Sequence, residues 1–319
     1  VVAAVSRAGG MGVFGGVNRS PEMLEEELSW IDAHVDGKPY GLDIIVPNKV
    51  EGKGEQLDPE AVLASIPDEH KQFTNDILQR HGVDTGRIAG DIEAVRREQV
   101  AFTDNLRGGT AEAILEVAFR HPIGLIANAL GIPPQVMLDM GKKHDVPVAA
   151  LIGTRDHAMS QVAAGVDIII AVGGEAGGHT GDISTMVLIP EVCNALAQIG
   201  DDTPVLAAGG IATGAQMAAA MAMGASGAWC GSVWLTTVEA ETNPVVKEKM
   251  LAATSRDTVR ARSRTGKPSR QLRSPWTDAW QAEGAPSPMN EQMTAGQVVQ
   301  GFKEDFLTAY ERLAANLGE

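Results

Sequence analysis

Cysteine and long apolar runs are both scarce in this sequence. Only Cys193 and Cys230 occur among 319 residues, and both lie in apolar segments far apart in the chain. Two such cysteines predict neither a disulfide framework nor a cysteine metal site, and they indicate a reducing, cytoplasmic compartment. No apolar run approaches the roughly 18 residues of a membrane-spanning helix, and no charged-then-apolar leader opens the chain. We therefore expect neither a membrane span nor a signal peptide.

Basic residues are also in deficit. The 26 Lys and Arg residues face 41 Asp and Glu residues, which gives a formal net charge of -15. An acidic surface repels nucleic acid phosphates and anionic lipid, so we expect a small-molecule substrate rather than a nucleic acid or a membrane. Hydrophobic residues make up 44% of the chain, which is enough for a sizeable core. We expect a single domain over residues 1–319 and leave oligomerisation open.

Short apolar runs rich in Val and Ile recur along the chain, each bounded by Gly or Pro. None shows the period-2 alternation of a half-exposed strand. Continuous apolar strands are typical of a parallel sheet that is covered on both faces. The seven runs are residues 10–16, 40–47, 123–128, 146–152, 166–172, 204–210 and 226–232.

Helix start signals lie between these runs. Ser20 followed by Pro21 combines an N-cap with proline at the first helical position, and the Asp-Pro pair at 58–59 repeats the device. Thr213 and Gln216 have the spacing of a capping box. This alternation of strand and helix patterns predicts a parallel α/β fold.

The spacing of the runs bears on which α/β architecture forms. Most runs are centred roughly 20 to 40 residues apart, which suits one strand and one helix per unit. Roughly 80 residues separate Ile44 from Leu125, so we expect a helical insertion over 49–107. An open doubly wound sheet fits seven strands, and so does a (β/α)8 TIM barrel whose first strand precedes Val1. The motifs below favour the barrel, with about twenty further residues expected before Val1.

Two glycine-rich turns follow the last two runs. "AAGGIATG" leads from a strand into the helix capped by Thr213, so Gly209 and Gly210 leave backbone N–H groups bare at a helix N-terminus. "GASGAWCGS" then places Gly231 and Ser232 at the end of the next strand. In TIM barrels the loops after the seventh and eighth strands commonly bind one phosphate together. The alternative is a pair of glycine-rich turns that bind nothing.

The stretch "GGEAGGHTG" at 173–181 ends another buried strand. Gly177 and Gly178 have no Cβ atoms, so a flat ligand can approach the backbone there, and His179 follows directly. An imidazole exchanges a proton near neutral pH, which makes His179 a candidate acid or base. The alternative is a histidine that holds the loop by a hydrogen bond.

The segments "DIIIAVGGEAGGHTG", "PVLAAGGIATG" and "GASGAWCGS" together resemble the nitronate monooxygenase (2-nitropropane dioxygenase) family. These FMN-dependent barrels also include flavin-dependent enoyl-ACP reductases. "VVAAVSRAGGMGVFGG" and "KPYGLDIIVP" resemble the family's first helix and second and third strands, so the resemblance covers nearly all of the chain except the insertion. It implies that His179 is a catalytic base or substrate anchor and that no metal is required. It further implies flavin contacts for Gly177 and Gly178 at the ring edge, and for Gly209, Gly210, Gly231 and Ser232 at the phosphate.

This sequence departs from the family pattern at two positions. Val172 stands where many members have a Gln that reaches the flavin, and Asp43 stands where many have Asn. An ionised Asp43 near the flavin ring would disfavour a reduced anionic flavin unless it is protonated or paired. Asp43 either contacts the cofactor or faces away from it. Asn128, at the end of the following run, is a second polar candidate for the cofactor, with a structural role as the alternative.

A basic segment interrupts the acidic background. It is expected either to recognise a carboxylate, a nucleotide phosphate or coenzyme A, or to be a solvated surface stretch. The residues that follow it, from Ser274 on, have a loop-like composition in which Trp276 and Trp280 can pack over one helical turn. The basic residues are Arg256, Arg260, Arg262, Arg264, Lys267, Arg270 and Arg273.

Three functions are compatible with these motifs. The first is an FMN-dependent nitronate monooxygenase that uses O2 to convert alkyl nitronates to a carbonyl compound and nitrite. The second is an NAD(P)H-dependent flavin reductase of enoyl thioesters or quinones. The third is a phosphate-binding barrel without flavin.

Overall fold

The computed structural model describes residues 1–17, 19–46, 67–86, 108–264 and 266–283. The chain divides into two compact units, and each is described by itself. Unit 1 comprises residues 1–53 and 104–257, and unit 2 comprises 54–103 and 258–319. The single domain expected from the sequence stays a prediction.

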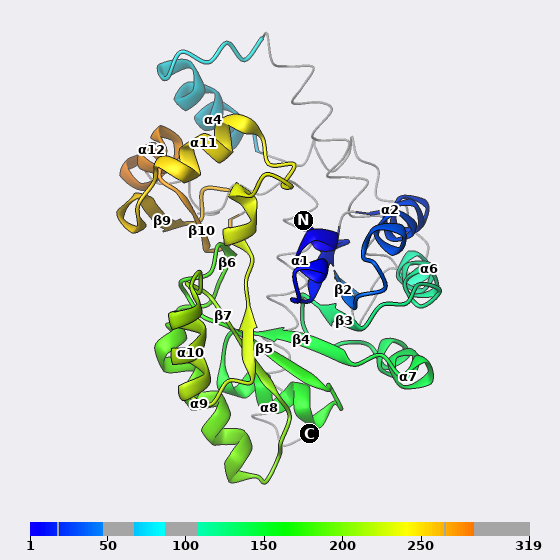
Figure 1. Cartoon of the computed structure of the whole chain (residues 1–319). Coiled ribbons are helices and arrows are strands. Elements are labelled where there is room, and N and C mark those ends of the chain that lie inside the picture. The colour runs from blue at the N-terminus through cyan, green and yellow to red at the C-terminus, as the bar shows by residue number, and fades with distance from the viewer. Residues whose placement is uncertain (18, 47–66, 87–107, 265, 284–319) are drawn as a thin grey trace. The chain divides into compact units, whose positions relative to one another are not determined.

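Unit 1 contains a seven-stranded parallel sheet whose strands follow one another in chain order, β1-β2-β3-β4-β5-β7-β8 (Figure 1). Every strand was predicted from its apolar run. Parallel neighbours require a crossover between them, and helices supply most of these crossovers. The strands are β1 (Gly12–Gly15), β2 (Tyr40–Ile44), β3 (Leu125–Asn128), β4 (Val148–Ile152), β5 (Ile168–Val172), β7 (Val205–Ala208) and β8 (Gly227–Trp229).

Helices alternate with these strands, as the sequence predicted. A two-residue strand, β6 (Gly178–His179), lies in the loop that follows β5. The other elements of unit 1 are α1 (Val2–Arg7), α2 (Pro21–His34), α6 (Gly108–Ala118), α7 (Gln135–His144), α8 (Arg155–Ala163), α9 (Thr185–Gln198), α10 (Gly214–Ala222), η1 (Ser232–Thr236), α11 (Pro244–Ala252) and η2 (Ser255–Asp257).

Two of the predicted helix starts are confirmed. Ser20 Oγ accepts a hydrogen bond of 3.3 Å from Met23 N at the start of α2. At α10, Thr213 Oγ1 accepts from Gln216 N, and Gln216 Oε1 accepts from Thr213 N, so both halves of the capping box are present. Each such cap contributes about 1 kcal/mol. The Asp-Pro signal at 58–59 lies outside the described residues.

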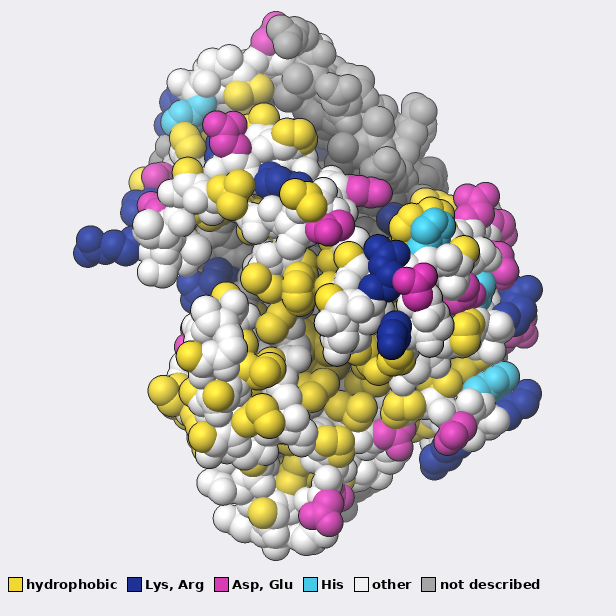
Figure 2. Space-filling view, in the orientation of Figure 1, with side chains coloured by type: hydrophobic (Ala, Val, Ile, Leu, Met, Phe, Trp, Pro, Cys, Tyr) yellow, Lys and Arg dark blue, Asp and Glu magenta, His cyan; other side chains and the backbone are white. Residues whose placement is uncertain are grey.

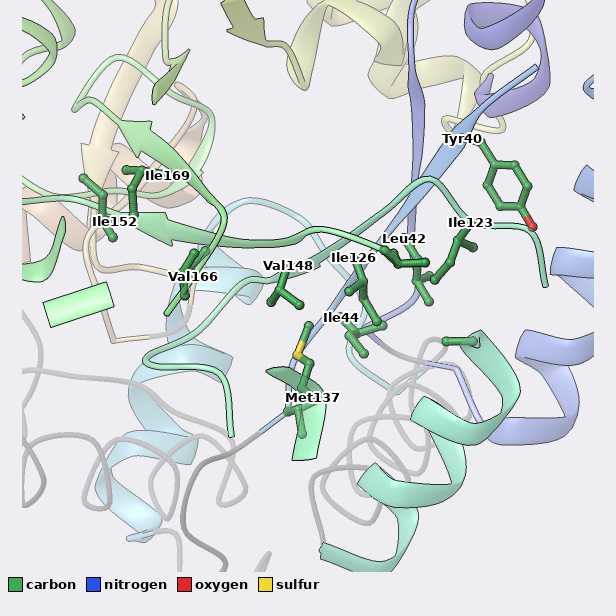
Figure 3. Packing of buried hydrophobic residues seen from close by; sticks show 14 of the residues in the cluster. Tyr40, Leu42, Ile44, Ile123, Ile126, Met137, Val148, Ile152, Val166 and Ile169 are labelled. Carbon is green, nitrogen blue, oxygen red and sulfur yellow. The ribbon is translucent and has the colours of Figure 1, made fainter. Parts of the chain in front are cut away.

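Apolar side chains cover both faces of the sheet. On the outer face, Ile44, Ile126 and Val148 belong to the large cluster that packs against the helices, and Figure 3 shows Met137 of α7 among them. A smaller apolar cluster lies on the inner face. It consists of Leu125, Ala127, Ala149, Ile170 and Ala208. Burial on both faces explains why the strand sequences are continuously apolar rather than alternating.

Helix α10 contributes little to this core. Only Ala220 of its nine residues is buried, whereas Met217 and Met221 are 43% and 48% exposed. Figure 2 shows apolar side chains gathered over this part of the surface.

A polar network ties the amino ends of β2 and β3 to α2. Tyr40 Oη donates a 2.6 Å hydrogen bond to Asp32 Oδ1, and His121 Nδ1 lies 2.6 Å from Asp32 Oδ2. Burial, and then the Asp32 carboxylate, raise the pKa of Tyr40. His121 Nε2 also lies 3.4 Å from Glu25 Oε1. In a barrel, residues at the amino ends of the strands contribute to stability, whereas the active site lies at the carboxyl ends.

Unit 2 contains helix α4 (Asp68–Arg80), the antiparallel strands β9 (Thr258–Ala261) and β10 (Ser269–Leu272), and helix α12 (Pro275–Glu283). Helices α4 and α12 pack together, with the rings of Phe73 and Trp280 5.8 Å apart. Helix α4 lies within the predicted insertion 49–107, whose remaining residues are mostly outside the described ones.

The structure corrects the loop prediction after Ser274. Residues 275–283 form a helix because Ser274 and Thr277 cap its start reciprocally: Ser274 N donates to Thr277 Oγ1, and Thr277 N donates to Ser274 Oγ. The predicted packing of Trp276 on Trp280 is confirmed, with ring centroids 6.0 Å apart. In the described part of the chain, no helix is long and apolar enough to cross a membrane.

Candidate functional site

Three glycine loops of unit 1 meet at the carboxyl ends of β5, β7 and β8. A Cβ atom on Gly177, in the loop after β5, would collide with Ser232 Oγ in the loop after β8. A Cβ atom on Gly210, after β7, would lie 3.1 Å from the Cβ of Glu175. Four predicted site residues, Gly177, Gly209, Gly210 and Ser232, are therefore in neighbouring loops. Barrel active sites lie at this end of the strands.

The turn after β7 presents bare backbone amides to solvent. Gly209 and Gly210 have φ values of 108° and 71°, a conformation that glycine adopts without strain. Within the described residues, the amides of Gly210, Ile211 and Gly231 donate to no acceptor. The N-terminus of α10 adds the positive end of its dipole. This arrangement suits a phosphate group.

Glu175 and Thr185 brace these loops, and neither was predicted. Glu175 Oε2 accepts hydrogen bonds from Thr185 N at 2.8 Å and from Thr185 Oγ1 at 2.9 Å. Thr185 Oγ1 also lies 3.0 Å from the carbonyl oxygen of Gly209. Ser184, the N-cap of α9, makes no side-chain cap, so the Glu175 carboxylate caps α9 from ten residues upstream. No local capping pattern has that spacing, which is why the sequence did not reveal it.

His179 lies in β6 directly after the glycine pair, and its side chain is exposed. The adjoining Gly177 and Gly178 are exposed as well. A ligand seated over these glycines therefore has backbone on one side and an imidazole beside it. Imidazole can accept a proton, donate one, or attract an anion when it is protonated.

Asp43 lies on the inner face of the sheet near the carboxyl end of β2. Its register partners are Gly15 of β1 and Ala127 of β3, and Ala127 belongs to the inner apolar cluster. Asp43 Oδ1 is buried and has no hydrogen-bond partner within the described residues. Burial raises the pKa of Asp43 to about 7. A carboxyl group at this position therefore exists in both protonation states near neutral pH.

Asn128 has a structural role in the described geometry. Its Oδ1 accepts from Val46 N at 2.9 Å, and its Nδ2 donates to the carbonyl oxygens of Leu130 and Gly131 at 2.8 and 3.2 Å. The side chain is fully buried and joins the end of β2 to the turn after β3. Both amide protons are used in this way, which favours the structural alternative over a cofactor contact.

The basic segment forms a β-hairpin in unit 2, which the sequence did not predict. Arg260 of β9 and Arg270 of β10 are directly opposite each other, and Arg270 Nη1 donates to Thr258 Oγ1 at 3.3 Å. Two guanidinium groups therefore belong to directly opposite positions of the hairpin. Arg273 is engaged differently, in an ion pair with Asp278 at 2.7 Å.

Metal ligation has no support in the parts of the chain that the structure describes. No group of three or more His, Cys, Asp or Glu side chains there could hold a metal ion.

Sequence comparison identifies a matching family and several relatives. The family profile described as nitronate monooxygenase matches residues 1–312. A Mycobacterium tuberculosis protein provisionally named a monooxygenase is 50% identical over 309 residues, which is 93% of this chain and 77% of the relative. A Rhodococcus jostii protein named a 5-hydroxy-7a-methyl-1-oxo-octahydro-1H-indene-4-carboxyl-CoA dehydrogenase is 36% identical over 173 residues, 54% of this chain and 47% of the relative.

Two solved structures share the fold. FabK from Thermotoga maritima has a TM-score of 0.64 at 24% identity, covering 99% of this chain and 90% of its own. Nitroalkane oxidase from Streptomyces ansochromogenes has a TM-score of 0.64 at 22% identity, covering 98% and 92%. These likenesses confirm the predicted TIM-barrel type of α/β fold. Since the family profile covers nearly the entire chain, the protein belongs to the nitronate monooxygenase family and is a flavin-dependent oxidoreductase.

Proposed function

We propose that the protein binds FMN at the three glycine loops and oxidises alkyl nitronates with O2 to a carbonyl compound and nitrite. The observation that carries this proposal is the meeting of Gly177, Gly210 and Ser232 beside solvent-facing amides. When bound, FMN supplies electron transfer between the nitronate and O2. The family profile supports the nitronate as the substrate class.

The loops after β7 and β8 would hold the FMN phosphate. The amides of Gly210, Ile211 and Gly231 supply donors, and the α10 N-terminus favours the dianion. The Ser232 hydroxyl, which lies against Gly177, adds a side-chain donor. Gly177 and Gly178 then leave room for the flat ring system, because neither has a side chain.

His179 would handle the proton or the charge of the substrate. A neutral nitroalkane must lose its acidic α-proton before oxidation, and an imidazole base can accept it. A nitronate supplied in its anionic form needs no base, but a protonated imidazole would still orient it. Loss of His179 should therefore lower turnover of the neutral nitroalkane more than turnover of the anionic nitronate.

The test is nitrite release from the FMN-loaded, full-length protein supplied with an alkyl nitronate in air. Nitrite and the matching aldehyde or ketone should form without NAD(P)H. Consumption of O2 and nitronate should stop when the protein is omitted. A loaded protein that forms no nitrite from primary or secondary nitronates would refute the proposed substrate class.

Reduction of an enoyl thioester by NAD(P)H is the second candidate. The specific observation for it is the Arg260–Arg270 pair, which suits the phosphates of a nucleotide or of coenzyme A. The Rhodococcus jostii relative is named for a CoA thioester substrate. NAD(P)H oxidation that requires an enoyl-CoA, weakens on Arg270→Gln, and occurs without nitrite formation would favour this candidate over nitronate oxidation.

A further inference from the structure

The inner face of the unit 1 sheet carries the half-buried carboxyl group of Asp43, whose Oδ1 atom is buried and whose register partners are Gly15 and Ala127. Asp43 is next to last in β2, so it lies near the carboxyl end of the strand, where barrel sites are formed. Residues in register on neighbouring strands point to the same face. Asp43 pairs with Gly15 and Ala127, whereas Leu42 and Ile44 on either side of it pack into the outer cluster. Its side chain therefore points to the inner face.

One oxygen of this carboxyl group lacks a partner within the described residues. Asp43 Oδ1 is buried without a hydrogen-bond partner. An ionised carboxylate in such a place carries a desolvation penalty, which shifts the equilibrium toward the protonated form. A protonated carboxyl has an O–H donor as well as an acceptor. An unpaired donor at the mouth of a barrel can form a hydrogen bond with a bound ligand.

We infer that Asp43 is a neutral acid in the resting protein and that its O–H donates a hydrogen bond to the ligand bound at the barrel mouth, where it favours negative charge on that ligand. This inference rests on the proposed flavin site. While Asp43 is neutral, reduction of the bound FMN is assisted. Once Asp43 is ionised, its charge opposes reduction, so the group couples the reduction potential to pH.

Among the described groups around Asp43, none is placed to couple the reduction potential to pH in its stead. The inner-face residues of β1 and β3, namely Val13, Gly15, Leu125 and Ala127, are not ionisable. Helix α1 also packs on β1 and β2, and its one charged side chain, Arg7, donates to the carbonyl oxygen of His34. No described cation is therefore placed to hold Asp43 in its ionised form, and burial is the cause of its raised pKa.

The neutral state is testable without a flavin. Infrared spectra of the flavin-free protein between pH 5 and pH 9 should show one protonated-carboxyl band that disappears with a midpoint near pH 7. The band should be absent in Asp43→Asn and retained in Asp156→Asn, which removes an exposed carboxylate of α8 paired with Arg155. A protein that shows no such band at pH 6 would overturn the inference, whether or not it binds FMN.

The ligand-facing role needs a second measurement on the FMN-loaded protein. The reduction potential of the wild type should fall more steeply with pH above 7 than that of Asp43→Asn, because Asn stays neutral and keeps a donor. Asp156→Asn should follow the wild-type curve. Identical pH profiles for the wild type and Asp43→Asn would overturn this role. Asp43→Ser, a smaller donor, provides the comparison if Asp43→Asn does not fold.

Discussion

Gly177 and Ser232 lie against each other although they belong to loops that follow different strands, β5 and β8. A Cβ atom on Gly177 would collide with the Ser232 hydroxyl, and the hydroxyl can escape only by turning to another rotamer. In the proposed site that rotation removes a donor from the FMN phosphate. The contact thus links the glycine that admits the ring to the serine that holds the phosphate.

Gly177→Ala is therefore expected to weaken FMN binding about tenfold, the equivalent of one lost hydrogen bond. Titration of the flavin-free protein with FMN, followed by flavin fluorescence, measures the effect. Gly181→Ala, in the same loop with only ordinary contacts around its new Cβ atom, is the matched control. In Gly177→Ala/Ser232→Ala the collision is gone, so the loss of FMN affinity should be smaller than the sum of the two single-variant losses. Strictly additive losses would contradict the proposed link.

Substitution of His179 should separate the two forms of the substrate. His179→Ala is expected to retain FMN and to lose about 10²-fold or more in kcat/KM for a neutral nitroalkane, the usual contribution of a general base. The loss for the preformed nitronate should be smaller. His157→Ala, an exposed histidine of α8, should behave like the wild type. Equal losses for both substrate forms would exclude a base and leave only a binding role.

The Glu175 brace should be measurable as stability. Glu175→Ala removes the acceptor for Thr185 N and Thr185 Oγ1, so we expect a loss of roughly 1–3 kcal/mol in the free energy of unfolding. Glu175→Gln keeps a carbonyl acceptor and should recover part of it. Glu191→Ala, at an exposed position of α9, should stay within about 0.5 kcal/mol of the wild type. Urea unfolding monitored by circular dichroism measures all three, and a neutral Glu175→Ala would show that the brace contributes nothing.

Asp43 should make folding stability depend on pH. The folded protein keeps this proton up to about pH 7, whereas the unfolded chain releases it near the ordinary value of 3.8. Above pH 3.8 the unfolded chain therefore gains relative to the folded protein, and the stability lost is complete above pH 7 at no more than about 4 kcal/mol. Asp43→Asn removes this loss, so it should raise Tm at pH 8 more than at pH 5. The same change in Tm at both pH values would argue against the raised pKa.

The network at the amino ends of the strands should affect stability and leave the chemistry intact. Tyr40→Phe leaves Asp32 Oδ1 without its donor, which should cost about 1–3 kcal/mol. FMN affinity and turnover of the folded enzyme should be unchanged, since the network lies away from the carboxyl ends. A variant with normal stability but reduced turnover would contradict this assignment.

Local chemistry explains which features the sequence could predict. Each strand of the seven-stranded sheet was predictable from its apolar run, and the capping box of α10 lies at the start of the helix itself. The phosphate loop was predictable for the same reason, because Gly209, Gly210 and Thr213 are close in the chain. Alternating elements of this kind then leave few topologies besides the barrel.

Contacts between distant segments explain the rest. Glu175 caps a helix across ten residues of loop, and the orphaned oxygen of Asp43 depends on neighbours from β1 and β3. Asn128 was a candidate ligand in the sequence because its partners, from Val46 to Gly131, are set by tertiary structure. The Arg260–Arg270 pair appears only once the strands are in register.

Release and identification of the chromophore test the account most directly. The full-length protein should show a flavin absorption spectrum, and denaturation should release FMN, identified by mass, at close to one equivalent per chain. Gly177→Ala should release less FMN than Gly181→Ala after the same dialysis. A colourless protein that also fails to take up added FMN would contradict the proposal that the three glycine loops form an FMN site.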